Sequence, residues 1–154
     1  MKILVCQISP KVGAINENFA TIKELYIKAC ESNADICVFP ELSTSGYLAE
    51  DLFLEQPFIE EIQQNLDRLI KEIKDTCLLI STPIEIGGCL FNAVIAAQNG
   101  RIIGKTYKHQ LPNYGIFDEK RYFTAGVPAV ITINGIKIGV PICEDIWFPE
   151  ICAQ

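Results

Sequence analysis

The chain has 154 residues, enough for one domain with a buried core. Its net charge of −6, without any basic stripe, argues against a nucleic-acid partner. No apolar run reaches the ~18 residues of a membrane-spanning helix, so we expect no membrane partner, and the first residues show no signal-peptide cleavage pattern.

The cysteines and the single histidine bear on whether the chain holds a metal site or disulfides. Seven cysteines lie in or beside apolar segments, no Cys-x-x-Cys pair is present, and the single histidine is His109. This pattern argues against a structural zinc site, so we predict no metal, and it also argues against a disulfide framework. Reduced thiols in a cytoplasmic protein fit best.

The first part of the chain alternates short apolar runs with helical patterns. Residues 3–7 predict a short buried strand, followed by a helix that Asn16 or Asn18 could cap. Apolar residues at three- and four-residue steps form one face of this helix: Phe19, Ile22, Leu25, Tyr26, Ala29 and Cys30. Residues 36–39 predict a strand covered on both faces.

A loop rich in Ser, Thr and Gly, residues 42–51, separates that strand from a second long helix. The apolar face of the second helix contains Phe58, Ile62, Leu66, Leu69 and Ile73. Residues 78–83 predict the next strand, which stops at a proline.

Two Asn-Gly pairs, Asn99-Gly100 and Asn134-Gly135, lie between apolar runs and predict tight type I′ hairpins. The first hairpin joins residues 90–98 to 101–107, and the second joins 129–133 to 136–142. A polar and aromatic loop, residues 108–126, separates the two hairpins. The element order predicts an α/β fold with a mixed sheet whose first part is parallel.

The run that ends the second hairpin leads into Cys143, and two carboxylates, Glu144 and Asp145, follow at once. A strand that ends in a cysteine and then turns sharply is one way in which enzymes present a nucleophile. Taken alone the signal is weak, because a cysteine beside an apolar run is more often a small buried hydrophobe.

Two upstream residues strengthen that interpretation. Glu41 follows Pro40 at the end of one predicted strand, and Lys108 ends another. Each would be read alone as a solvent-exposed charge. Together with Cys143 they form a set in which Glu41 takes the thiol proton and Lys108 stabilises the thiolate and an oxyanion. The backbone N–H of Glu144 would be a second oxyanion donor. Such a set predicts acyl transfer from an amide or a nitrile.

Three motifs in this order resemble the catalytic motifs of the nitrilase (carbon-nitrogen hydrolase) superfamily. They are Phe39-Pro40-Glu41-Leu42, Lys108-His109-Gln110-Leu111-Pro112 and Ile142-Cys143-Glu144-Asp145. Within that superfamily the chain is most similar to the glutaminase domains of glutamine-dependent NAD synthetases, through residues 41–52, 111–123 and 143–149. The resemblance covers the whole chain.

The resemblance implies an α-β-β-α sandwich and a Glu-Lys-Cys triad, here Glu41, Lys108 and Cys143. It implies that glutamine is cleaved to glutamate and ammonia through a thioester on the cysteine, without a cofactor. By motif position, three residues would hold glutamine and one would be an accessory carboxylate near the lysine. These are Tyr47, Tyr114 and Glu144 for glutamine, and Glu119 for the accessory carboxylate.

The resemblance also implies a partner, a synthetase domain in cis or in trans that amidates nicotinic acid adenine dinucleotide. ATP and Mg would belong to that domain, and the family implies a homo-oligomer. Neither a Ser-Gly-Gly pyrophosphatase loop nor a Walker-type Gly-x-x-x-x-Gly-Lys occurs in the sequence. We therefore expect the synthetase domain to be absent. Because the family's hydrolase domain continues well past its catalytic cysteine, we also expect residues 1–154 to be an incomplete hydrolase domain, the N-terminal part of the sandwich.

Three alternatives stay open. The triad could act on a simple amide, a nitrile or a carbamoyl compound instead of glutamine. The chain could also be an inactive remnant that serves as a binding module or has no function. A Cys-His glutaminase would need His109, but His109 adjoins Lys108, and neighbours on an extended segment point to opposite faces.

Overall fold

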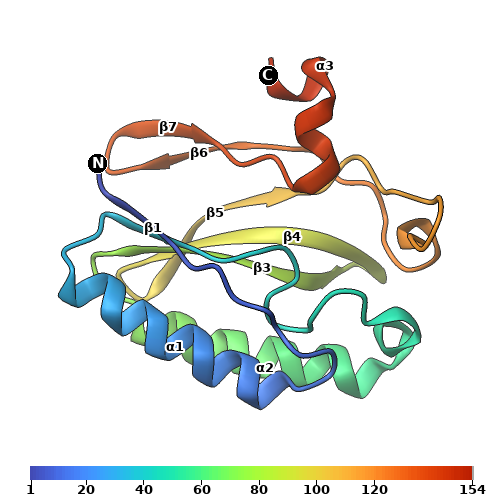
Figure 1. Cartoon of the computed structure of the whole chain (residues 1–154), viewed down its shortest axis with the longest axis horizontal. Helices are drawn as coiled ribbons and strands as arrows, with labels where there is room; N and C mark the ends of the chain where they lie inside the picture. Colours follow the sequence, from blue (N-terminus) through green and yellow to red (C-terminus); the bar gives the residue numbers. More distant parts are fainter. Residues whose placement is uncertain (154) are drawn as a thin grey trace.

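The computed structural model describes residues 1–153 as a mixed α/β arrangement in layers (Figure 1). Two long helices cover one face of a five-stranded sheet, and a two-stranded hairpin lies on the other face. The helices are α1 (Ile15–Glu31), α2 (Gln56–Glu72) and the short α3 (Pro149–Cys152). The strands are β1 (Ile3–Val5), β2 (Ile36–Val38), β3 (Cys77–Ile86), β4 (Cys89–Gln98), β5 (Arg101–Tyr107), β6 (Val130–Ile133) and β7 (Ile136–Gly139).

The large sheet has the strand order β1-β2-β3-β4-β5. The first three strands run parallel, as predicted, and β3, β4 and β5 pair antiparallel. Both Asn-Gly turns are confirmed. Asn99 and Gly100 have φ values of 52° and 73°, and Asn134 and Gly135 have φ values of 50° and 79°. Positive φ at both central positions is what a type I′ turn requires.

One hairpin was missed. The structure carries β3 through Pro83 to Ile86 and returns into β4 through Gly87-Gly88. Proline is tolerated here because β2 pairs with β3 only at residues 77–79, so at Pro83 the strand has a single strand neighbour. The Gly-Gly pair is itself a hairpin signal that could have identified this turn.

Three further expectations need correction. Strand β1 is shorter than predicted and is not buried, because it forms one edge of the sheet, with Ile3 52% and Val5 69% exposed. Neither Asn16 nor Asn18 caps α1, whose N-cap is Ala14. Strand β7 ends at Gly139, well before residue 142, and it is mostly exposed because it pairs with β6 alone.

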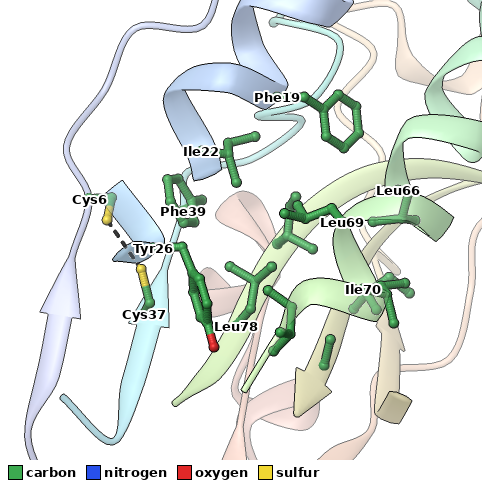
Figure 2. Packing of buried hydrophobic residues seen from close by; sticks show 14 of the residues in the cluster. Cys6, Phe19, Ile22, Tyr26, Cys37, Phe39, Leu66, Leu69, Ile70 and Leu78 are labelled. Carbon is green, nitrogen blue, oxygen red and sulfur yellow. Dashed lines mark hydrogen bonds between the residues drawn. The ribbon is translucent and has the colours of Figure 1, made fainter. Parts of the chain in front are cut away.

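The main core lies between the helices and the sheet (Figure 2). Phe19, Ile22 and Tyr26 of α1 meet Leu66 and Leu69 of α2 over the apolar side chains of β2 to β4. Burying each such side chain contributes about 1.5–3 kcal/mol. The predicted helix faces are therefore confirmed as the surfaces that fix both helices on the sheet.

A second core lies on the opposite face of the sheet. Ile131 and Ile133 of β6 pack there against Leu79 and Val94, together with Ile142. A Cβ added to Gly104 of β5 would lie 2.7 Å from the side chain of Ile131, so glycine permits this close approach. The hairpin therefore places the segment leading to Cys143 directly over the sheet.

A third cluster holds the long loops at one end of the sheet. Phe53 contacts the Phe123 ring at a centroid distance of 4.8 Å, and both pack with Leu42 and Leu111. This cluster joins the loop after β2 to the loop after β5, which lie at the same end of the molecule in Figure 1. Within residues 1–153, no helix combines the length and apolar character that crossing a bilayer demands.

Candidate active site

Glu41 stands where β2 ends and the chain turns away from the sheet. Pro40 precedes it, and Leu42, which follows with a φ of 47°, donates its backbone N–H to the Ser81 hydroxyl at 2.8 Å. The next side chains bond to β3 as well, because the Ser43 hydroxyl donates to the carbonyl of Ser81. These bonds fix the backbone on the C-terminal side of Glu41.

The same loop is held from its other side by the N-terminal segment. Gly13 donates its N–H to the Ser45 carbonyl at 2.9 Å. A Cβ added to Gly46, which has a φ of 79°, would lie 2.6 Å from the backbone of Val12. Buried Asn18 accepts from the Lys11 N–H and donates to the carbonyls of Lys11 and Thr44, which is its role in place of capping α1.

Lys108 follows the last residue of β5 and is fully buried. Its ammonium donates to Glu41 Oε1 at 2.6 Å and to Glu119 Oε1 at 2.7 Å. Burial alone lowers the pKa of Lys108, but attraction and hydrogen bonds from the two carboxylates outweigh it and leave the pKa raised. Lys108 therefore stays an ammonium, and two of its three N–H bonds are committed to Glu41 and Glu119.

Glu119 begins a short 3-10 helix, η2 (Glu119–Arg121), and is 1% exposed. Its Oε1 accepts from Lys108 and from the Tyr47 hydroxyl, the latter at 2.8 Å. Its Oε2 is buried and has no hydrogen-bond partner among residues 1–153. Burial raises the pKa of Glu119 above its ordinary value, although Lys108 opposes that shift. The Tyr47 hydroxyl is thus committed to Glu119, the residue expected to be the accessory carboxylate.

Asn92 joins this group and was missed in the sequence. It lies on β4, 1% exposed, and its Nδ2 donates to Glu41 Oε1 at 2.7 Å. Its backbone carbonyl accepts the N–H of Lys108 at 2.9 Å. The available signal was one amide side chain inside the apolar run 90–97.

Cys143 opens the 3-10 helix η3 (Cys143–Trp147), and its side chain is exposed. Its φ is 50°, which is uncommon for a residue with a side chain and marks a constrained turn. Partial burial, and next the negative charge of Glu41, raise the pKa of the Cys143 thiol above its ordinary value. At neutral pH the resting group is therefore a thiol rather than a thiolate.

Asp145 connects the cysteine turn to the lysine segment, and no role had been predicted for it. The side chain is 1% exposed. Oδ1 accepts the backbone N–H of Gln110 at 2.7 Å and that of His109 at 3.1 Å, and Oδ2 accepts the N–H of Ile142 at 3.2 Å. One carboxylate thus fixes the residue before Cys143 relative to the two residues after Lys108.

Tyr114 and Glu144 also meet. The Tyr114 hydroxyl donates to Glu144 Oε2 at 2.7 Å, and Glu144 directly follows Cys143. Phe117 lies edge-on to Tyr114 at a centroid distance of 5.5 Å and also contacts the Tyr47 ring at 6.3 Å. Phe117 therefore contacts two of the three residues expected to hold a substrate, and the third, Glu144, is bonded to Tyr114.

His109 points away from this set. Its side chain is exposed, and Nδ1 lies 2.8 Å from the carbonyl oxygen of Gly126. The imidazole contact is therefore with a backbone carbonyl, while the neighbouring Lys108 side chain points inward. Across residues 1–153, no group of three or more His, Cys, Asp or Glu side chains is arranged to hold a metal ion.

The sequence profile described as Carbon-nitrogen hydrolase matches residues 2–154. A glutamine-dependent NAD(+) synthetase from Xanthomonas campestris pv. campestris is 39% identical over 159 residues, covering 100% of this chain and 29% of that protein. One from Acinetobacter baylyi is 40% identical over 148 residues, covering 95% of this chain and 27% of that protein. The chain therefore spans less than a third of the length of these relatives.

Solved structures agree on the fold. The glutamine-dependent NAD+ synthetase from Acinetobacter baumannii, in complex with ADP, superposes with a TM-score of 0.92 and 38% identity, over 99% of this chain and 29% of that one. An amidase from Nesterenkonia sp. superposes with a TM-score of 0.83 and 23% identity, over 98% of this chain and 58% of that one. The expected nitrilase-like fold is thus shown over part of the longer chains.

Proposed function

Because the chain belongs to the carbon-nitrogen hydrolase family, we propose that Cys143, Glu41 and Lys108 hydrolyse the side-chain amide of glutamine. The observation that carries this proposal is the buried ammonium of Lys108, shared by two carboxylates beside a thiol on a constrained turn. The choice of glutamine rests on the 38–40% identity to enzymes named glutamine-dependent NAD synthetases.

In the first half-reaction the Cys143 sulfur attacks the amide carbon while Glu41 takes the thiol proton. The carbonyl oxygen becomes an oxyanion, stabilised by the third N–H of Lys108 and by the backbone N–H of Glu144. When the intermediate collapses, the C–N bond breaks, and Glu41 returns its proton to the nitrogen. Ammonia leaves, and the γ-glutamyl group remains as a thioester on Cys143.

In the second half-reaction water attacks the thioester carbon, and Glu41 takes the water proton. The same donors hold the oxyanion until the C–S bond breaks. The proton then returns to the sulfur, so glutamate leaves and Cys143 is again a thiol. A raised thiol pKa fits this route, in which the carboxylate removes the proton during attack rather than beforehand.

Tyr114 and Glu144 would hold the amino-acid end of glutamine, with Glu144 pairing the α-ammonium. Their hydrogen bond lies next to the nucleophile turn. Tyr47 would line the same pocket with its ring, because its hydroxyl is already committed to Glu119. Glu119 would keep Lys108 charged and in place through both half-reactions.

The ammonia would pass to a synthetase domain, in cis or in trans, that amidates nicotinic acid adenine dinucleotide. ATP and Mg would act in that domain, and the hydrolysis itself needs no cofactor. The link to a synthetase domain is supported by the longer relatives, which are named glutamine-dependent NAD(+) synthetases. We also propose that the assembly is a homo-oligomer and cytoplasmic.

The test is ammonia and glutamate release from glutamine, an aliphatic amide and a nitrile by a protein in which residues 1–154 are part of a complete hydrolase domain. By themselves the 154 residues are expected to be an incomplete domain that does not hydrolyse glutamine. We expect glutamine to be preferred, Cys143→Ala to abolish release, and His109→Ala to retain it. Preference for the amide or the nitrile would change the substrate class. Equal losses in His109→Ala and Lys108→Ala would favour a Cys-His mechanism, and no release from any compound would favour an inactive module.

A further inference from the structure

Asn92 is a polar side chain placed where β4 is otherwise apolar. Residues 93–97 of the same strand are all buried hydrophobics. A buried amide is costly unless its groups are bonded. Asn92 makes one side-chain bond, from Nδ2 to Glu41 Oε1, while its Oδ1 has no partner among residues 1–153. The site therefore tolerates an unpaired acceptor in order to keep the amide N–H on Glu41.

The orientation of that amide follows from charge. Turning it over would place Oδ1 against the carboxylate of Glu41 and lose an N–H···O bond to a charged acceptor, the stronger class of hydrogen bond. The observed orientation gives Glu41 Oε1 two donors, Lys108 at 2.6 Å and Asn92 at 2.7 Å. A carboxylate oxygen has about two acceptor sites, so Oε1 is saturated.

Saturation of Oε1 leaves Oε2 as the oxygen that can take a proton. The last torsion of a glutamate side chain is broad, so one donor would let the carboxylate rotate. Two donors, Asn92 on β4 and Lys108 directly after β5, fix its plane. Asn92 also fixes the backbone of Lys108, because the Asn92 backbone carbonyl accepts the Lys108 N–H at 2.9 Å.

We propose that Asn92 is a positioning residue that holds Glu41 Oε1 and thereby presents Oε2 to the thiol of Cys143. The inference rests on the proposed function, since it assigns Glu41 as the base. It predicts that Asn92 acts on the proton-transfer step and not on the affinity for glutamine. Within residues 1–153, the hydrogen bonds of Asn92 reach neither Tyr114 nor Glu144.

Asn92→Leu is the sharpest variant, because leucine is similar in size and suits a buried strand. We expect its melting temperature to stay close to that of the unaltered chain, because only one side-chain bond is lost. The kcat for glutamine should fall ~10²-fold, the lower end of a general-base contribution, with KM nearly unchanged.

Alkylation of Cys143 by iodoacetamide, followed against pH with peptide mass spectrometry, gives a readout independent of glutamine. In Asn92→Leu the Glu41 carboxylate is free to rotate and spends less time near the Cys143 thiol. The midpoint, the pH at which alkylation reaches half its maximal rate, should therefore fall by roughly half to one unit. In Asn92→Asp a second negative charge faces the site, so the midpoint should move to higher pH, again with reduced kcat.

Thr76→Val is the matched control. Thr76 is also a buried polar residue, but its hydroxyl donates to the backbone carbonyl of Ala34, outside the site. This variant should have a lower melting temperature, yet keep the kcat and the alkylation midpoint of the unaltered chain at temperatures where it is folded.

An unaltered kcat in Asn92→Leu would overturn the proposal. If the unaltered protein, assayed with a complete hydrolase domain, does not hydrolyse glutamine, the proposed function fails and the alkylation midpoints alone decide about Asn92. Midpoints in both Asn92 variants equal to that of the unaltered chain would then overturn the positioning role.

Discussion

Lys108→Met tests the charge balance of the site most directly. The change removes the ammonium that lies 2.6 Å from Glu41 Oε1 and 2.7 Å from Glu119 Oε1, in a position without solvent access. Removing one partner of a buried ion pair costs ~3–5 kcal/mol, because the remaining charge is uncompensated. Two carboxylates are left here, so we expect ~4–5 kcal/mol at pH 7, a large part of the ~5–15 kcal/mol that stabilises a typical domain.

The loss of stability in Lys108→Met should depend on pH through Glu119. Burial already raises the pKa of this carboxyl in the unaltered chain. A carboxyl whose pKa is higher in the folded than in the unfolded state contributes stability at low pH, and that contribution is lost as the pH rises through the folded value. Without Lys108 this pKa rises further. The destabilisation of Lys108→Met relative to the unaltered chain should therefore shrink as the pH falls from 8 to 5, by up to ~1.4 kcal/mol per unit.

Urea unfolding at four pH values between 5 and 8 measures this. Lys105→Met, on the same strand and outside the ion network, is the control and should stay within ~0.5 kcal/mol. The double variant Lys108→Met/Glu119→Gln should recover much of the stability and none of the activity. A destabilisation of less than ~1 kcal/mol, or one independent of pH, would refute the reasoning that Lys108 compensates two carboxylates.

Three further outcomes follow from the site. A diazoketone analogue of glutamine should label Cys143 first, as peptide mass spectrometry would show; first labelling of exposed Cys152 would contradict the assignment. Tyr114→Phe and Glu144→Gln should raise the KM for glutamine ~10- to 150-fold with little change in kcat, since a single hydrogen bond to a charged group contributes ~1.5–3 kcal/mol. An unaltered KM in the steady-state kinetics of both folded variants would exclude that role. Asp145→Asn should lower both the melting temperature and the rate of Cys143 alkylation, because one amide cannot accept all three N–H groups that the carboxylate accepts. Unaltered values in both assays would show that the turn at Cys143 does not depend on Asp145.

Local chemistry in the sequence was enough to predict the helices, the parallel start of the sheet and two hairpins. The apolar spacing of α1 and α2 and the Asn-Gly pairs each carry a local cause, so the prediction did not depend on the rest of the fold. Pro83 misled the prediction because its effect depends on which strands lie beside it. The exposure of β1 likewise follows from its place at the sheet edge, which its own residues do not encode.

The residues of the candidate site also fall into those that local sequence could single out and those that it could not. Glu41, Lys108 and Cys143 each follow a recognisable apolar run, so they could be singled out, although their roles remain proposals. Asn92 and Asp145 could not be assigned from spacing, because each acts through a contact with a distant segment. Asn92 bonds to a residue 51 positions earlier, and Asp145 to residues 35 and 36 positions earlier.

The order of the site residues along the chain has a consequence for synthesis. A ribosome delivers Glu41 first, then Lys108 and Glu119, and the cysteine only afterwards. The ion network closes contacts between residues 67 and 11 positions apart, and neither contact involves Cys143. Glu41 and Lys108 can therefore neutralise each other while the chain is still growing. The Cys143 thiol meets them only once the second hairpin has docked, so until then its pKa lacks the increase that burial and Glu41 cause in the folded chain.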